Sequence, residues 1–199
     1  MTKIRIISVV IVFASINIIS ADLRGQDNTP KKLITMEFGP AFSGSGDMLG
    51  RLLNVEYGRG LSNKFTLGFG VHTGVFSGGT FNNDFKEEHK IRGVDLNTYF
   101  FPLAKSKSQT GFFISPGINV RQWNSFYQTG IINGFTLSGV PIEPNTIVRE
   151  QMRMLGYNLL LGYRFKVTES CVGQIRMGVQ NDFYGNIVSA IRFGAGYRF

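Results

Sequence analysis

The sequence N-I-V-S-A-I-R-F-G-A-G-Y-R-F, from Asn186 to Phe199, ends the chain with a strict two-residue alternation. The odd-numbered positions are mostly apolar and become aromatic toward Phe199. The even-numbered positions are small or cationic, apart from Asn186 and Val188 at the start. Successive side chains of a β-strand point to opposite faces, so this pattern predicts a strand whose two faces meet different environments.

The same alternation recurs upstream and predicts seven further strands, at residues 33–42, 51–58, 65–75, 93–101, 112–121, 151–165 and 174–180. Pro116 falls inside one of them and predicts a bulge, because proline cannot donate to the ladder of a central strand. Two polar or irregular stretches, Ser77 to Lys90 and Asn124 to Val148, are expected to be the longest loops. No helix and no second domain are predicted.

The end of the last strand resembles the C-terminal assembly signal of bacterial outer-membrane β-barrel proteins. The resemblance rests on Gly194, Tyr197 and Phe199, although Phe193 stands where a polar residue is usual. From roughly Leu33 onward the chain is similar to small OmpA-like barrels of the porin superfamily. This resemblance implies an all-β, eight-stranded antiparallel up-and-down transmembrane β-barrel in the bacterial outer membrane. It also implies outer-membrane lipid and the barrel-assembly machinery as partners.

The N-terminus has the features of a secretory signal peptide. Lys3 and Arg5 precede an apolar core at residues 6–19, and Ser20-Ala21 offers a small-residue cleavage site. This core is too short to be a good membrane anchor. We therefore expect a signal peptide at residues 1–21, a short flexible periplasmic lead at 22–32 and the barrel at 33–199.

Alternation alone does not say which face of the barrel is inside, since the opposite choice gives a soluble lipocalin-like barrel. Three features favour the membrane. Compact and longer connections alternate, no lysine lies in the middle of a strand, and aromatic residues gather near the compact turns. Short periplasmic turns, longer outer loops and aromatic girdles are typical of outer-membrane barrels. Eleven tilted residues span about 28 Å, enough for an apolar band of about 25 Å.

The net charge of +8 does not predict nucleic-acid binding. The lysines are scattered over turns and strand ends, whereas a nucleic-acid site gathers its cations on one face. The single cysteine, Cys171, allows no internal disulfide. The two histidines have no metal-ligand spacing. We expect no cofactor and no metal.

Polar residues on the face opposite the lipid are expected to fill the lumen, because eight strands leave room for little more than side chains. Glu37, Arg176 and Arg192 become neighbours once the barrel closes. An ionic gate and a space-filling set of ion pairs are both compatible with this, and buried charges that need partners favour the second. Lumenal glycines leave a narrow channel open as an alternative. The expected lumen polar network is Glu37, Glu56, Asp95, Arg121, Arg164, Arg176 and Arg192, with His72, Asn119, Asn158 and Gln174 as further inward residues.

An enzyme that modifies lipid A is the second alternative, because some small outer-membrane barrels use histidine, serine and an acid. His72 is expected to point inward near the outer end of its strand, and His89 to lie in a solvated charge run. The sequence shows no nucleophile and base at matching spacing. We therefore predict that the protein is not an enzyme.

The remaining candidate is the aromatic-containing stretch 124–148. It could simply extend two strands above the membrane, or it could form a contact surface, as loops on rigid scaffolds commonly do. The sequence favours an envelope or surface-interaction protein that binds an extracellular ligand there.

Overall fold

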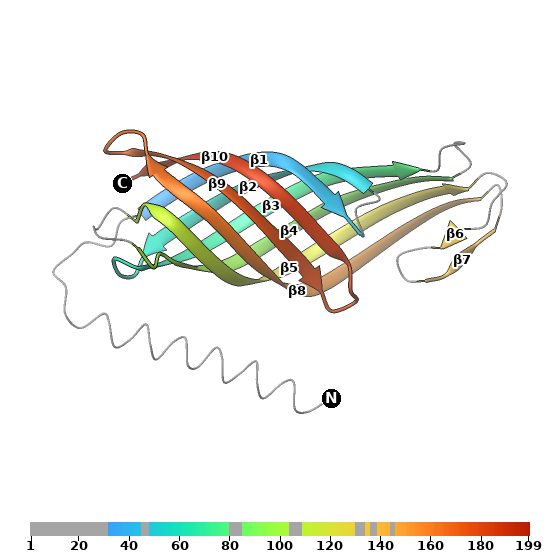
Figure 1. Cartoon of the computed structure of the whole chain (residues 1–199). Coiled ribbons are helices and arrows are strands. Elements are labelled where there is room, and N and C mark those ends of the chain that lie inside the picture. Colours follow the sequence, from blue (N-terminus) through green and yellow to red (C-terminus); the bar gives the residue numbers. More distant parts are fainter. Residues whose placement is uncertain are drawn as a thin grey trace, which may run out of the picture.

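A computed structural model describes residues 32–44, 48–79, 85–103, 109–129, 134–135, 139–143 and 146–199. It is a closed barrel in which neighbouring strands follow one another along the chain in antiparallel order (Figure 1). The barrel strands are β1 (Lys32–Ser43), β2 (Met48–Gly60), β3 (Phe65–Gly79), β4 (Phe85–Phe100), β5 (Gly111–Thr129), β8 (Ile147–Lys166), β9 (Cys171–Asp182) and β10 (Ile187–Arg198). This confirms the predicted all-β, eight-stranded fold.

The alternation in sequence becomes an alternation in burial. Along β1 every second side chain is buried, so Glu37 lies inside while Met36 and Phe38 are more than half exposed. Large apolar side chains cover the outside and polar ones fill the inside, the reverse of a soluble barrel. In the part of the chain that the structure describes, no helix is long and apolar enough to cross a membrane.

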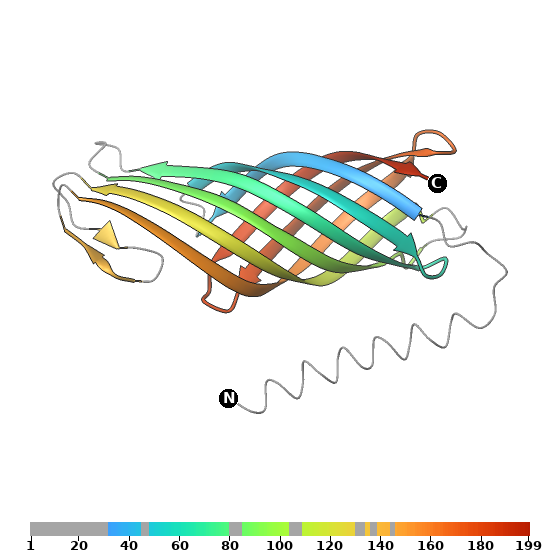
Figure 2. The same ribbon diagram turned by 180° about the vertical axis from the view of Figure 1, so that it is seen from behind.

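The barrel closes between β1 and β10, where Leu33 pairs with Arg198 and Phe38 with Phe193. Two main-chain bonds between Lys32 and Phe199 complete the join, at 3.2 and 3.1 Å. Residue 32 and the C-terminus therefore lie at the same end of the barrel, which we call the terminal end (Figure 2). The opposite end is the loop end.

At the loop end of the barrel, four strands extend four to eight residues beyond their predicted bounds. β3 and β4 continue to Gly79 and back from Phe85, so the long loop expected at Ser77 to Lys90 is wrong for most of its length. β5 reaches Thr129 and β8 begins at Ile147, as in the interpretation that extends two strands above the membrane. These four strands have 15 to 20 residues, against 12 or 13 in the other four.

The extra length forms a projecting wall at the loop end, made of residues 73–79, 85–92, 122–129 and 147–153. Figure 1 shows β3, β4, β5 and β8 running beyond the neighbouring strands. A small hairpin of β6 (Gly134–Phe135) and β7 (Pro141–Ile142) lies beside the tip of this wall.

Pro116 does not produce the predicted bulge. The pairs Asn97↔Gly117 and Phe100↔Ile114 on its two sides share one register, and the β5–β8 ladder runs through Pro116 without a break. Only the ladder toward β4 is interrupted, as expected for a residue without an N–H. The proline side chain points outward, where it needs no space in the lumen.

Two apolar layers lie inside the lumen. The loop-end layer consists of Ala41, Met48, Leu52, Phe76, Ile91, Trp123, Met154, Val188 and Ala190. The terminal-end layer consists of Tyr99, Phe101 and Phe113. Polar side chains occupy the space between them.

Candidate functional site

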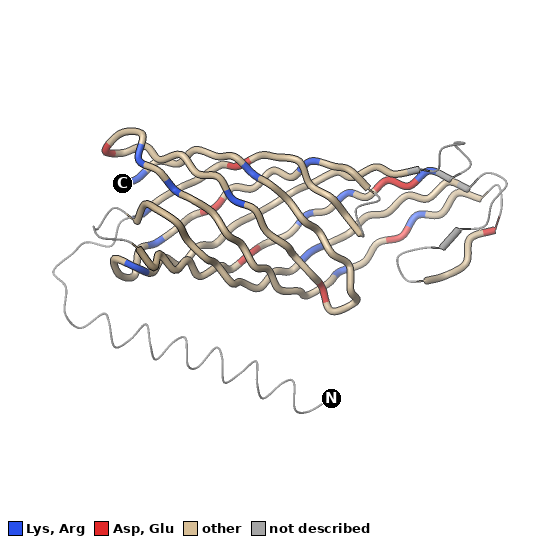
Figure 3. Tube along the Cα trace, viewed as in Figure 1, with Lys and Arg blue, Asp and Glu red and all other residues tan. Residues whose placement is uncertain are grey.

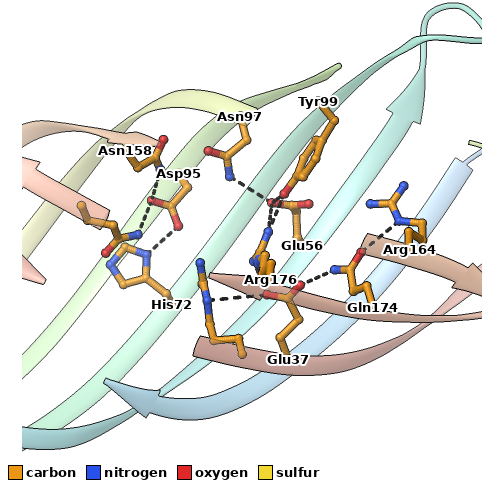
Figure 4. A network of polar contacts seen from close by, with 12 residues as sticks. Glu37, Glu56, His72, Asp95, Asn97, Tyr99, Asn158, Arg164, Gln174 and Arg176 are labelled. Carbon is orange, nitrogen blue, oxygen red and sulfur yellow. Dashed lines mark hydrogen bonds and ion pairs between the residues drawn. The ribbon is translucent and has the colours of Figure 1, made fainter. Parts of the chain in front are cut away.

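Glu37 belongs to a cluster of polar side chains inside the lumen (Figure 4). Its carboxylate forms an ion pair with Arg176, accepts a hydrogen bond from Gln174 and lies 3.9 Å from Nε of Arg192. β1, β10 and β9 are neighbouring strands in the closed barrel, so residues far apart in the sequence come together here. Gly194 stands opposite Glu37, and a Cβ at that position would lie 2.5 Å from Cγ of Glu37. A glycine is therefore required for this carboxylate to enter the lumen.

A second carboxylate, Glu56, joins the same cluster. It accepts hydrogen bonds from Asn97 at 3.0 Å and from the Tyr99 hydroxyl at 2.7 Å. Arg176 donates to both Glu56, at 3.5 Å, and Tyr99, at 2.5 Å. One guanidinium thus bridges two buried carboxylates, which is the pairing that charges need in a water-poor interior.

Arg164 connects this cluster to the terminal-end layer. Its Nε donates to Gln174 at 2.9 Å, and its guanidinium carbon lies 5.2 to 5.7 Å from the ring centroids of Phe101, Tyr99 and Phe113. Cation–π contacts with three rings stabilise this buried cation, and its Nη1 has no hydrogen-bond partner among the described residues. Arg164 and the three rings form a packed cluster inside the lumen toward the terminal end.

His72 and Asp95 form a separate pair in the middle of the barrel. Nδ1 of His72 lies 2.7 Å from a carboxylate oxygen of Asp95. The other oxygen of Asp95 accepts from Asn158 at 3.3 Å and Gln180 at 3.4 Å. His72 pairs with Gly93 near the centre of β3, not at the outer end of the strand as the sequence predicted.

Arg121 lies beneath the loop-end layer. Its Nη2 lies 3.5 Å from Oδ2 of Asp182, and its guanidinium carbon lies 5.6 Å from the Trp123 ring centroid. It also donates to the main-chain oxygen of Asn186 at 3.4 Å. Trp123 stacks on Phe76 with a centroid distance of 6.4 Å, so a cation and two large rings fill this section of the lumen.

The seven residues predicted for the lumen all lie inside, each at most 3% exposed. They form three groups. Glu37, Glu56, Arg176 and Arg192 meet in one group, which Arg164 joins through Gln174. Asp95 belongs to the His72 group and Arg121 to the Asp182 group. Four further lumen residues were not predicted from the sequence as members of the network: Asn97, Tyr99, Gln180 and Asp182. The alternation of their strands placed the first three inward, but Asp182 was assigned to a turn.

The residues predicted to form the assembly signal lie along β10 and its end. Tyr197 and Phe199 face outward, each more than half exposed, with ring centroids 6.4 Å apart. The Lys32 ammonium lies 5.9 Å from the Phe199 ring. The predicted signal peptide, 1–21, and the lead up to residue 31 lie outside the described residues.

The prediction that His89 is solvated is wrong. Its side chain is 2% exposed, lies 2.5 Å from Glu87 and meets the Trp123 and Tyr127 rings edge-on. Ser125 is its direct partner across β4 and β5. Glu87 and His89 are thus in contact on the inner face of the projecting wall with Ser125 on the neighbouring strand, an arrangement that the spacing in sequence did not reveal, and the Ser125 hydroxyl has no hydrogen-bond partner among the described residues. Both histidines face inward, away from the apolar outer surface.

The predicted ligand loop 124–148 divides into two parts. Residues 124–129 and 147–148 belong to the projecting wall, and Ile142 of β7 is buried. Residues 130–133, 136–138, 144 and 145 lie outside the described residues.

Structural comparison finds this fold in proteins of very different sequence. Ail, the attachment invasion locus protein of Yersinia pestis in complex with the heparin analogue sucrose octasulfate, is 12% identical with a TM-score of 0.56. The alignment covers 86% of this chain and 100% of Ail. A second structure of Ail gives 13% identity, a TM-score of 0.54 and the same coverage.

A major outer membrane protein from Thermus thermophilus is 16% identical, with a TM-score of 0.48 over 84% of this chain and 99% of that chain. No protein-family model and no curated protein sequence matches the chain. The likeness to Ail establishes the fold.

Proposed function

We propose that this protein is an integral barrel of the bacterial outer membrane with a filled interior, and that it acts through the surface at its loop end. Outward-facing apolar side chains surround every strand, and a lipid bilayer is the environment in which such a surface is stable. Short turns at the terminal end orient that end toward the periplasm and the projecting wall toward the exterior.

The observation that carries the proposal is the division of the lumen. Apolar layers lie on both sides of the polar clusters, and the arginines between them are paired or stacked. A solute would have to displace Trp123 and Phe76 at one end and Phe113 at the other. This packing favours a role at the surface over passage through the barrel.

The projecting wall offers a rigid platform for such a role. Its inner face is packed with Trp123, Tyr127 and His89, so the wall holds its shape above the membrane. Ail, a protein of the same fold, has been crystallised with a heparin analogue and is described as an attachment invasion locus protein. This supports an attachment role for the loop end here. Because both histidines point into the barrel, we further propose that the protein is not catalytic.

Replacing residues 130–146 by a short glycine-containing turn tests the proposal. The replacement leaves the wall strands intact, since each satisfies its hydrogen bonds with its neighbours. We expect wild-type amounts of folded barrel and loss of attachment of protein-displaying cells to immobilised matrix proteins and sulfated glycans. The control replaces residues 80–84 in the same way and should retain attachment. Undiminished attachment without residues 130–146 would refute a role for this loop.

A further inference from the structure

The outer surface changes from apolar to cationic within one row of side chains. Four outward-facing residues that are direct partners across β3, β4, β5 and β8 are all apolar: Val71, Val94, Val120 and Leu155. Two positions nearer the loop end, the partners in the next outward row are Thr73, Arg92, Gln122 and Arg153. We call the outward apolar surface that ends at Val71, Val94, Val120 and Leu155 the apolar belt. Two arginines, Arg92 and Arg153, therefore lie at its edge toward the loop end.

Further cations follow on the same surface of the projecting wall. We call this surface the cationic face, and it consists of Lys86, Lys90, Arg92, Arg149 and Arg153, all exposed. Glu88 is the one acid among the outward residues that the structure describes on these strand segments, and it lies 2.9 Å from Lys90. Arg92 and Arg153 form no ion pair with any described residue. Figure 3 shows the charged residues along these strands.

Among the described residues, the other half of the barrel carries one outward cation toward the loop end, Arg51 on β2, and no cluster of cations. Toward the loop end, the outward residues described on β1, β9 and β10 are apolar or neutral: Phe38, Pro40, Phe42, Met177, Val179, Asn181, Ile187, Ser189 and Ile191. A wall that only needed solubility would be served by both signs of charge or by neutral polar groups. The excess of one sign on one side indicates an anionic ligand.

The apolar surface beside the cationic face is grooved. One groove is lined by Leu53, Val55, Val71, Thr73 and Arg92, and an adjoining one by Phe38, Leu49, Arg51 and Val75 among others. Both share Leu53 and Thr73. An arginine thus stands beside each of two grooves that have apolar floors.

We propose that the cationic face and these grooves form a docking site for the phosphate groups and acyl chains of a phosphorylated lipid in the outer leaflet. A ligand that contacts both Arg92 and its outward neighbour Val94 must be amphipathic, which favours a lipid over a soluble polyanion. Guanidinium groups are well suited to bind phosphate oxygens in pairs. The inference rests on the membrane location proposed above.

The test uses the refolded barrel in phosphatidylcholine vesicles with and without lipid A that carries both phosphates. The readout is the temperature at which the heat-modifiable folded form is lost, together with lipid retained after detergent extraction and measured by native mass spectrometry. We expect lipid A to raise this temperature, and dephosphorylated lipid A to have little effect. In the double variant Arg92→Gln/Arg153→Gln the shift should disappear and lipid A retention should fall several-fold.

Two controls separate the site from general electrostatics. The double variant Lys32→Gln/Lys166→Gln removes exposed cations at the terminal end and should keep the full shift. The double variant Arg92→Lys/Arg153→Lys retains both positive charges and should keep most of the temperature shift. An unchanged shift in Arg92→Gln/Arg153→Gln would overturn the proposal. So would soluble heparin that displaces the lipid completely, which would assign the face to soluble polyanions. Failure of the wild-type barrel to insert into neutral vesicles would instead refute the membrane location.

Discussion

Phe69 is an outward residue on β3, between Leu67 and Val71, and its side chain is 53% exposed. In a membrane this side chain meets acyl chains, so Phe69→Arg is expected to destabilise the refolded barrel by about 2–4 kcal/mol. Ser77 lies on the same strand and face but beyond the apolar belt, where Ser77→Arg should cost about 0–1 kcal/mol. Denaturant titration in lipid vesicles measures both, and equal effects would mean that the apolar face does not contact lipid.

Glu37 supplies negative charge to Arg176 and Arg192 inside the lumen. Glu37→Gln keeps the shape but leaves these cations with too little counter-charge, and breaking a buried pair costs about 3–5 kcal/mol. The exposed pair of Lys166 and Glu169 provides the control, because Glu169→Gln should leave the denaturation midpoint nearly unchanged. A small effect of Glu37→Gln would show that water reaches the cluster.

At the scale of single residues, the sequence predicted which side chains enter the lumen better than what they contact. Period-two alternation placed Glu37, Arg176 and Arg192 inward, and barrel closure made them neighbours. The contacts of Tyr99 with Glu56 and Arg176 depend on strand register and tilt, which alternation does not determine. His89 was missed because Glu87, Glu88 and Lys90 around it conceal the alternation of its strand.

Among the elements, β10 has a distinct role because it closes the barrel against β1. We expect Phe199→Ala to lower the amount of folded protein in the outer membrane while export across the inner membrane continues. The expected reason is that the outward aromatic end of this strand is read during assembly. Heat-modifiability on gels measures the folded fraction. Phe112→Ala, which removes another outward ring at the terminal end, should have a much smaller effect, and equal losses would contradict a special role for β10.

The strand ends that the sequence missed most, at the loop end of β4 and β5, share a physical cause. Nearer the terminal end, one face of each strand carries exposed apolar side chains and the other carries mostly polar side chains in the lumen, so the alternation is clear. Along residues 85–92 and 122–129 the outward face carries Lys90, Arg92 and Asn124, while the inward face is also partly polar with His89 and Ser125. Both faces then look alike in sequence, although the backbone ladder continues unchanged.

For the molecule as a whole, we propose that function lies on the outside and at the loop end and that the interior has a structural role. Apolar layers around Trp123 and Phe113 lie toward the two ends of the lumen, and between them Arg176 forms an ion pair with Glu37. Eight-stranded barrels are just wide enough for side chains to fill them. The projecting wall and the cationic face are the features that this barrel has in addition to its packed interior.

Ion conductance of the refolded protein in a planar lipid bilayer tests this division most directly. The filled lumen predicts that insertion, verified by heat-modifiability of the same preparation, produces no steady current above that of the bare bilayer. Arg176→Gln and Arg192→Gln should not create ion selectivity where there is no current. A steady open conductance whose selectivity shifts in either variant would contradict the account and identify the lumen as a channel.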